Sequence, residues 1–133
     1  MTGRMQAPRS ARCRRRLGPG RWRVRARLER FIEPAVLLVL RDSPGHGYEL
    51  LEQLQTLMPG ERIDMGNLYR ILRSLEREGL VSSTWDVDAP GPAKRIYVIT
   101  PSGERVLGQW VDAFEKIEQQ IAAFSRRYER GRG

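Results

Sequence analysis

Apolar positions recur with a helical period after residue 30 and predict two helices joined by a turn. Residues 31–41 are almost all apolar, with a proline near their start, and a turn sequence follows at residues 42–45. Residues 46–58 place four leucines at helical spacing and are followed by Pro59 and Gly60, which end a helix. We expect the first of these helices to be mostly buried, because its apolar residues leave little room for a polar face.

A third helix is predicted over residues 65–78, and its two faces differ in chemistry. The apolar stripe consists of Leu68, Ile71, Leu72 and Leu75. At about 100° per residue, Arg70, Arg73 and Arg77 fall on the opposite face, and no acidic residue lies on that stripe. Such a face is often only a solvated surface, yet three unneutralised guanidinium groups pointing one way also suit a polyanion.

Between residues 80 and 100 the pattern changes to that of two strands. Residues 80–87 and 94–100 are rich in Val, Ile, Thr and aromatic residues, and segment 88–93 between them has the prolines and glycine of a hairpin tip. Three helices followed by a hairpin is the element order of a winged helix, in which the third helix enters the DNA major groove and the wing touches flanking DNA. Lys94 and Arg95 would then sit beside the wing tip. The predicted fold class is mainly α with a small β hairpin.

The last predicted helix begins at Thr100 and Pro101, an N-cap followed by proline at the first helical position. Its apolar residues are spaced 3, 4, 3, 4, 3 and 4 apart and form a heptad seam: Leu107, Trp110, Phe114, Ile117, Ile121, Phe124 and Tyr128. A helix of nearly thirty residues runs about 43 Å, farther than a winged domain of residues 31–100 can cover. We expect its first half to pack on its own domain and much of the rest to form a symmetric dimer interface.

Trp110 is the largest residue of the seam and has two interpretations. It is either a tryptophan buried in the dimer interface, which is the simpler interpretation, or part of a small-molecule effector pocket at the dimer centre, since aromatic walls suit planar ligands. A two-fold dimer would also present two recognition helices, and hence bind double-stranded DNA at a two-fold operator.

Charge is distributed unevenly between the first 30 residues and the rest. Residues 1–30 hold eleven arginines and one acidic residue, Glu29, and carry a net +10, whereas residues 31–133 carry a net −2. The overall net charge of +8 therefore describes this arm and not the folded part of the chain. For that reason the basic total is not by itself an argument for nucleic acid.

The arm of residues 1–30 has no sustained apolar period and is interrupted by proline and glycine, which predicts disorder. Three interpretations stay open. The arm is a phosphate-binding segment whose arginines release counterions from DNA, a solvated tail of little consequence, or a stretch upstream of the true translation start. The predicted domains are this arm, a winged-helix DNA-binding domain at 31–100 and a dimerisation helix at 101–130.

Composition narrows the class of protein. A length of 133 residues with 40% hydrophobic and 30% charged residues fits one globular domain. Every apolar run is far shorter than the roughly 18 residues that a membrane-spanning helix needs. No secretory signal is recognisable. The single cysteine excludes an intramolecular disulfide and fits the reducing cytoplasm.

The chain offers little for catalysis or metal binding. With one histidine and one cysteine, we expect no metal site. A Gly-rich phosphate loop and clustered carboxylates are also missing from the sequence. We therefore expect neither a cofactor nor an enzyme.

Several stretches of the chain resemble the PadR family of bacterial transcriptional regulators. They are residues 46–50 (HGYEL), 66–72 (GNLYRIL), 75–81 (LEREGLV) and 91–100 (GPAKRIYVIT), with Gly103 and Trp110 beyond them. The single long C-terminal helix is similar to that of the short subgroup. Residues 31–34 (FIEP) and the Leu68–Arg70 turn also resemble polyhydroxybutyrate-responsive repressors.

The resemblance implies a dimeric winged-helix repressor in which the start of the third helix and the wing contact DNA. With Arg77 added from the arginine face, the candidate DNA-contacting residues are Asn67, Tyr69, Arg70, Arg73, Arg77, Lys94 and Arg95. His46 and Tyr48 also belong to the matching motifs but are interpreted structurally. We expect His46 to cap the second helix and Tyr48 to pack with its hydroxyl hydrogen-bonded.

These observations favour a sequence-specific DNA-binding regulator, most simply a repressor relieved by a small-molecule ligand. The alternative is a winged-helix protein-interaction module without sequence-specific DNA binding. In that case the seam and the net-negative body would bind another protein, and nucleic-acid binding would be confined to the arm.

Overall fold

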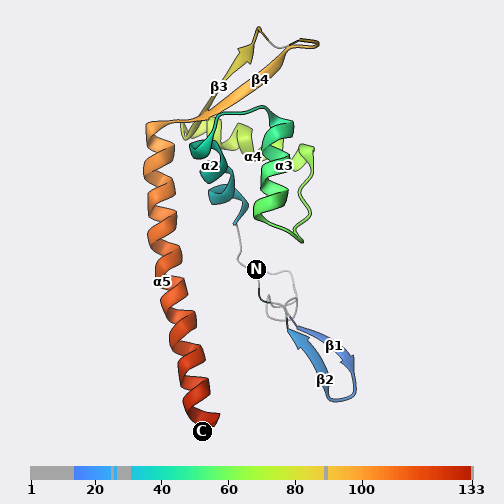
Figure 1. Ribbon diagram of the computed structural model, residues 1–133, viewed down its shortest axis with the longest axis vertical. Helices are drawn as coiled ribbons and strands as arrows, with labels where there is room; N and C mark the ends of the chain where they lie inside the picture. The colour runs from blue at the N-terminus through green and yellow to red at the C-terminus, as the bar shows by residue number, and fades with distance from the viewer. Residues whose placement is uncertain (1–13, 25, 27–30, 89, 133) are drawn as a thin grey trace, which may run out of the picture. The chain divides into compact units, whose positions relative to one another are not determined.

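The computed structural model describes residues 14–24, 26, 31–88 and 90–132. The chain divides into two compact units, Met1–Phe31 and Ile32–Gly133. In the larger unit the described residues form three helices, a two-stranded hairpin and one long helix, in that order (Figure 1). This is the predicted winged helix followed by a long C-terminal helix.

α2 (Ile32–Asp42), α3 (Gly47–Leu57) and α4 (Met65–Arg77) surround the core of the larger unit. The largest fully buried side chains are Val36, Leu37, Leu40, Leu50, Leu54, Leu68, Leu72, Leu75 and Val81. Those in α2, α3 and α4 belong to the predicted apolar helix faces, and Val81 begins the first strand of the wing. Hydrophobic burial therefore orients all three helices. Leu57 was predicted to lie on the same face as Leu50 and Leu54, but it is exposed in the last turn of α3.

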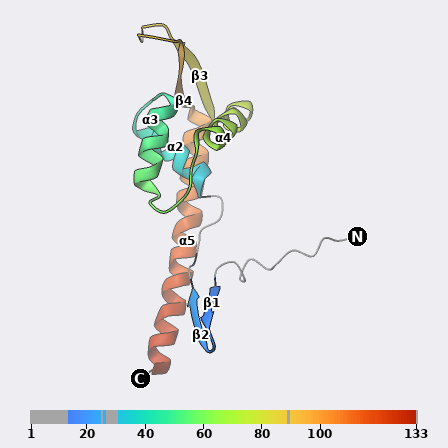
Figure 2. The same ribbon diagram turned by 90° about the vertical axis from the view of Figure 1, so that its right-hand side faces the viewer.

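The wing is an antiparallel pair of β3 (Val81–Asp86) and β4 (Lys94–Ile99), in register from Val81 opposite Ile99 to Asp86 opposite Lys94. Its base is tied to the turn before α3, because the backbone groups of Gly45 and Tyr97 exchange two hydrogen bonds of 3.2 and 2.9 Å. Figure 2 shows the wing projecting beyond the helices. The distance between wing and α3 is therefore set by the backbone itself.

α5 (Pro101–Arg132) begins at the predicted cap. The Thr100 hydroxyl accepts a hydrogen bond from the backbone N–H of Gly103 at 3.0 Å and donates one to the carbonyl of Gly79 at 2.7 Å. Gly103 is buried so closely against the carbonyl of Leu80 that a Cβ there would clash with it. The first turn of α5 is thus fastened to the chain between α4 and the wing.

Only the first part of α5 is covered by the rest of the larger unit. Leu107 is buried and Trp110 is half-buried, whereas Ile121, Phe124 and Tyr128 are 57%, 77% and 60% exposed. Both views show α5 running away from the wing and past the ends of α2 and α3 (Figures 1 and 2). The C-terminal half of the predicted seam is an apolar stripe in contact with solvent in the single chain.

The smaller unit contains a hairpin of β1 (Arg14–Gly18) and β2 (Arg21–Val24). The expectation of disorder was wrong for these residues, which pair antiparallel around a turn where Gly20 has φ +71°. Composition misjudged them because a positive-φ glycine and backbone pairing favour a hairpin even where the side chains are charged. Residues 1–13, 25 and 27–30, including Cys13, lie outside the described residues.

Candidate nucleic-acid interface

α4 presents the predicted arginine face to solvent. Its N-terminus is capped by Asp64, whose carboxylate accepts a hydrogen bond from the backbone N–H of Asn67 at 2.7 Å. Arg70, Arg73 and Arg77 are exposed, while the opposite leucine stripe is buried. Burial of one face thus leaves the arginines directed outward.

Side-chain contacts hold the wing strands against α4. The Ser83 hydroxyl donates to the carboxylate of Glu76 at 2.8 Å and accepts from the guanidinium of Arg95 at 2.7 Å. The same guanidinium lies over the ring of Trp85, 4.6 Å from its centroid. Arg95 is therefore oriented before any ligand arrives, and Glu76 connects the back of α4 to the wing.

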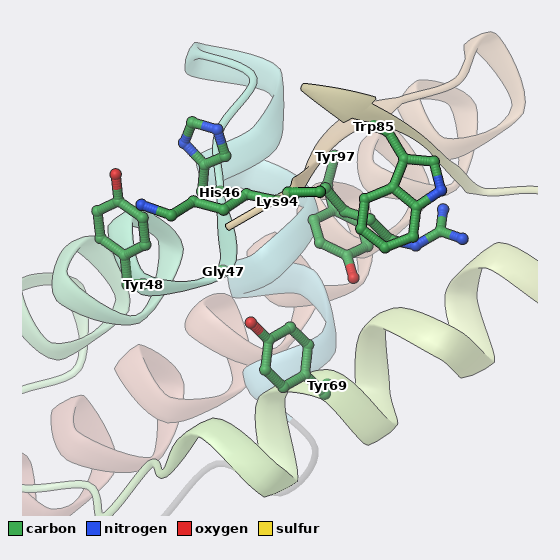
Figure 3. A pocket seen from close by; sticks show the side chains of 9 residues that line it. His46, Gly47, Tyr48, Tyr69, Trp85, Lys94 and Tyr97 are labelled. Atoms are coloured by element: carbon green, nitrogen blue, oxygen red, sulfur yellow. The ribbon is translucent and has the colours of Figure 1, made fainter. Parts of the chain in front are cut away.

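A cavity of about 330 Å³ opens between the start of α3, α4 and the wing (Figure 3). Its lining consists of His46, Gly47, Tyr48, Tyr69, Trp85, Ala93, Lys94, Arg95 and Tyr97. The Lys94 ammonium reaches across it to lie 4.8 Å from the centroid of the Tyr48 ring. Burial raises the pKa of the Tyr97 phenol, so this hydroxyl remains protonated at neutral pH. The cavity thus combines aromatic walls with two cations.

The structure brings together some of the predicted DNA-contacting residues and leaves others apart. Tyr69, Lys94 and Arg95 line the cavity. Arg70, Arg73 and Arg77 follow the exposed face of α4 outside the cavity lining. Asn67 is half-buried at the first turn of α4. The candidate site is therefore a helix face with a concave pocket beside it.

Gly47 allows α3 and α4 to approach each other at the cavity. A Cβ at this position would lie 2.8 Å from the Tyr69 hydroxyl oxygen. In the sequence Gly47 is only one residue of the HGYEL motif, whereas its role follows from a contact between residues 22 positions apart. No local pattern in the sequence contains that information.

His46 joins α3 to the wing through two carboxylates. Nδ1 lies 2.8 Å from Oε1 of Glu49, and Nε2 lies 2.9 Å from Oδ2 of Asp86. A neutral imidazole has one N–H, so only the imidazolium donates to both acceptors. The hydrogen bond to Asp86 is the largest cause that raises the pKa of His46, and hydrogen bonds from His46 lower the pKa of Glu49.

His46 occupies the N-cap position of α3, as predicted, and the Glu49 carboxylate also accepts from its backbone N–H at 2.8 Å. Tyr48 differs from the prediction, because its side chain is half-exposed and stacks on the His46 ring at 5.5 Å between centroids. Asp86 was missed altogether, since it lies 40 residues from His46 in the chain and carries no motif.

Trp110 lines a shallow hollow of about 200 Å³ on α5, with Val106, Gln109 and Ala113. Its ring lies 5.5 Å from that of Phe114. All four of the lining residues that the structure describes belong to α5. Among the residues that the structure describes, no group of His, Cys, Asp or Glu could hold a metal ion. None of the described helices is long and apolar enough to cross a membrane.

Residues 36–109 match the model of the transcriptional regulator PadR-like family. The chain belongs to this family. The match spans α2, α3, α4, the wing and the beginning of α5, so it includes every element that forms the candidate site. The predicted family is thereby confirmed. The narrower resemblances, to the short subgroup and to polyhydroxybutyrate-responsive repressors, stay predictions.

Relatives of this PadR-family chain include the transcriptional regulator Rv3488 of Mycobacterium tuberculosis, which is 34% identical over 80 residues, 60% of this chain and 72% of the relative. Among solved structures, the potential transcriptional factor TM0937 is 34% identical with a TM-score of 0.69, over 79% of this chain and 95% of that one. Bacillus subtilis PadR, solved in complex with operator DNA, is 24% identical with a TM-score of 0.56, over 63% of this chain and 48% of that one. The names of the family and its relatives indicate a transcriptional regulator and not an enzyme.

Proposed function

We propose that this PadR-family chain regulates transcription by binding DNA, with α4 in the major groove and the wing on the flanking backbone. The observation that carries the proposal is the exposed arginine face of α4 beside a wing in which Ser83 holds Arg95 and Lys94 lies over the ring of Tyr48. It is supported by the shared fold of Bacillus subtilis PadR, which was solved with operator DNA.

The proposed contacts divide into base readout and backbone binding. Arg70 and Arg73 on the exposed face of α4 would read base edges, because a guanidinium makes a bidentate contact to guanine. Arg77, in the last turn of α4, and Asn67 and Tyr69, near its start, would contact phosphates or sugars beside them.

The cavity between α3 and the wing would receive a phosphate of the DNA backbone. Lys94 and Arg95 supply positive charge there, and the hydroxyl of Tyr69 supplies a hydrogen-bond donor. Aromatic rings lie beside both cations, Tyr48 beside the Lys94 ammonium and Trp85 beside the Arg95 guanidinium, which helps to hold these charges at the cavity. This role makes the cavity part of the DNA interface.

A second copy of the chain would cover the exposed seam of α5. The proposed dimer interface is Leu107, Trp110, Phe114, Ile117, Ile121, Phe124 and Tyr128. A heptad seam that leaves Phe124 77% exposed in one chain favours a helical partner with the same seam. Two winged helices related by a two-fold axis would then bind a two-fold operator.

Repression relieved by a small molecule is the proposed mode of regulation. The described lining of the hollow at Trp110 lies on α5 alone, and a partner chain would close this hollow into a pocket by supplying the opposite side. An effector there would act on the spacing of the two recognition helices. The domains in this proposal are a winged helix at 31–100 and a dimerisation helix at 101–130, in a cytoplasmic protein.

Selection of binding sites from a pool of random duplexes by the full chain tests the proposed function. Fluorescence anisotropy at about 150 mM salt then compares the selected duplex with a scrambled one. We expect a preference of about 10³ or more for the selected duplex. Equal affinity for both would overturn sequence-specific binding and leave the winged-helix protein-interaction module as the function.

A further inference from the structure

We propose that the β1–β2 hairpin is a second binding site for the phosphate backbone of nucleic acid, separate from the winged helix. The site consists of Arg14, Arg15, Arg16, Arg21 and Arg23, which we call the arginine ribbon. The family match begins at residue 36 and does not include it. The choice of DNA as the ligand rests on the proposed function. The charge and geometry of the ribbon are observed independently of that function.

The arginine ribbon is a concentrated and accessible positive charge. All five arginine side chains are exposed on strands that together span residues 14–24. The same eleven residues contain no Asp or Glu, so the five arginines give the hairpin segment a formal charge of +5. Every one of these cations is an arginine, whose planar guanidinium pairs with a phosphate through two parallel hydrogen bonds.

The register of the hairpin spreads the charge over both of its faces. Arg15 lies directly opposite Arg23, and directly opposite residues point to the same face. Arg14 and Arg16, opposite Val24 and Trp22, point to the other face because side chains alternate along a strand. A polyanion that passes along either face therefore meets at least two guanidinium groups.

The same register makes the hairpin dependent on a counter-charge. Like charges directly opposite each other destabilise a strand pair, and a two-stranded hairpin is at best marginally stable by itself. Phosphates between Arg15 and Arg23 would convert repulsion into attraction. We therefore expect DNA to stabilise the hairpin and the hairpin to add affinity without regard to base sequence.

A two-stranded ribbon also has the right dimensions for this polymer. The major groove of DNA admits a two-stranded β-ribbon, and duplex DNA offers one negative charge about every 1.7 Å along its axis. Each phosphate that the ribbon neutralises releases condensed counterions. The salt dependence of binding therefore counts the arginines that take part.

The test measures the affinity of the full chain for a random-sequence 30-base-pair duplex as a function of salt. In one variant the five arginines are replaced by glutamine, and in a matched control they are replaced by lysine. Each phosphate contact contributes about −0.9 to the slope of log K against log salt concentration. We expect the slope to become shallower by at least about 2 in the glutamine variant, because either face of the ribbon offers at least two guanidinium groups, and to change little in the lysine variant.

Two further measurements separate this proposal from the proposed function. The glutamine variant should retain the preference for the selected duplex over the scrambled one, since base readout belongs to α4. DNA should also slow amide hydrogen exchange in residues 14–24 of the unsubstituted chain. If neither the unsubstituted chain nor any variant preferred the selected duplex over the scrambled one, the proposed function would be overturned. The salt dependence of binding to the random-sequence duplex would still show whether the arginine ribbon binds DNA.

An unchanged slope in the glutamine variant would overturn the ribbon as a DNA site. Vesicles containing 30% phosphatidylserine, which carry phosphate in a membrane, provide the competing source of the same chemistry. If the glutamine substitutions abolish binding to these vesicles but leave the DNA slope unchanged, the ribbon is a membrane site and the proposal is wrong.

Discussion

Individual residues of the candidate site have separable tasks. Burial of the leucine stripe sets the direction of Arg70 and Arg73, while Arg95 is held by Ser83 and Trp85. Arg70 and Arg73 lie on the exposed face of α4, whereas Arg95 is fixed within the wing. Substitutions on α4 should therefore change sequence preference, and substitutions in the wing should change affinity for all duplexes.

Replacing Arg70 by alanine tests base readout directly. We expect a loss of about 1–3 kcal/mol in binding to the selected duplex and relaxed specificity at one position of the site. Anisotropy with duplexes altered one base pair at a time measures both. Arg126→Ala, which removes an exposed arginine far along α5, is the control and should leave binding within about 0.5 kcal/mol. A uniform loss across all duplexes would make Arg70 a phosphate contact.

His46 makes stability depend on pH near neutrality. Its pKa in the folded chain lies above its ordinary value of 6.5, because Asp86 and Glu49 accept from the ring. The imidazolium thus stabilises the fold fully below 6.5, and this contribution is lost as pH rises through the raised pKa. Glu49, with a lowered pKa, contributes in the opposite sense and is lost only in acid.

The prediction is a decrease in the free energy of unfolding as pH rises above the ordinary pKa of 6.5 and through the raised pKa of His46. Urea unfolding at fixed protein concentration measures it, and His46→Gln should flatten the curve. His46 is the one histidine of the chain, so no other imidazole contributes to the difference between the two curves. If the free energy of unfolding depended on pH in the same way in both proteins, the stabilising role of the His46 contacts with Glu49 and Asp86 would be contradicted.

At the level of elements, the close approach of α5 to the start of the wing depends on a missing side chain. Gly103 leaves no space for a Cβ beside the carbonyl of Leu80, which belongs to the backbone and has little freedom to move. Gly108, one turn further along the same helix, has nothing within 4 Å of the position where its Cβ would be. The two glycines therefore differ in context and not in secondary structure.

Alanine substitutions at these glycines should have opposite effects. Gly103→Ala is expected to lower the free energy of unfolding by about 1–3 kcal/mol through overpacking. Gly108→Ala should raise it by up to about 1 kcal/mol, because alanine is the better helix former. Thermal or urea unfolding compares the pair. Equal effects would show that the contact with Leu80 does not limit α5.

At the level of the whole molecule, α5 has more apolar surface than one chain can bury. The wing and the C-terminal end of α5 lie at opposite ends of the larger unit (Figure 2). A dimer along the seam would therefore form away from the wing and leave it accessible. In such a dimer α5 would both join the two chains and set the distance between the two α4 helices, and hence the spacing of the DNA half-sites.

Charges placed in the seam should dissociate the proposed dimer. Ile121→Glu combined with Phe124→Glu is expected to raise the dimer dissociation constant by about 100-fold or more, because the interface would bury unpaired carboxylates. Gln119→Glu, an exposed position outside the heptad seam, is the control. Sedimentation velocity over a range of concentrations gives the answer, and an unaffected dimer would place the interface elsewhere.

The sequence by itself determined the order of the elements in the larger unit, the arginine face of α4 and the seam of α5. These features depend on the period of neighbouring residues, which sets one buried and one exposed face without any knowledge of the partner. The expectation of disorder was wrong for residues 14–24. It rested on their lack of an apolar period and on their charged composition, and it overlooked the backbone pairing around Gly20.

Only the tertiary structure decided what lies beside these faces. His46 meets Asp86 across 40 residues, and Gly47 admits the ring of Tyr69. Gly103 faces the carbonyl of Leu80 for the same reason, namely that segments distant in the chain converge. Such contacts depend on how packed elements meet, and the periodic pattern of neighbouring residues does not encode them. The cavity and the contacts of His46 with Glu49 and Asp86 therefore could not be predicted from the sequence.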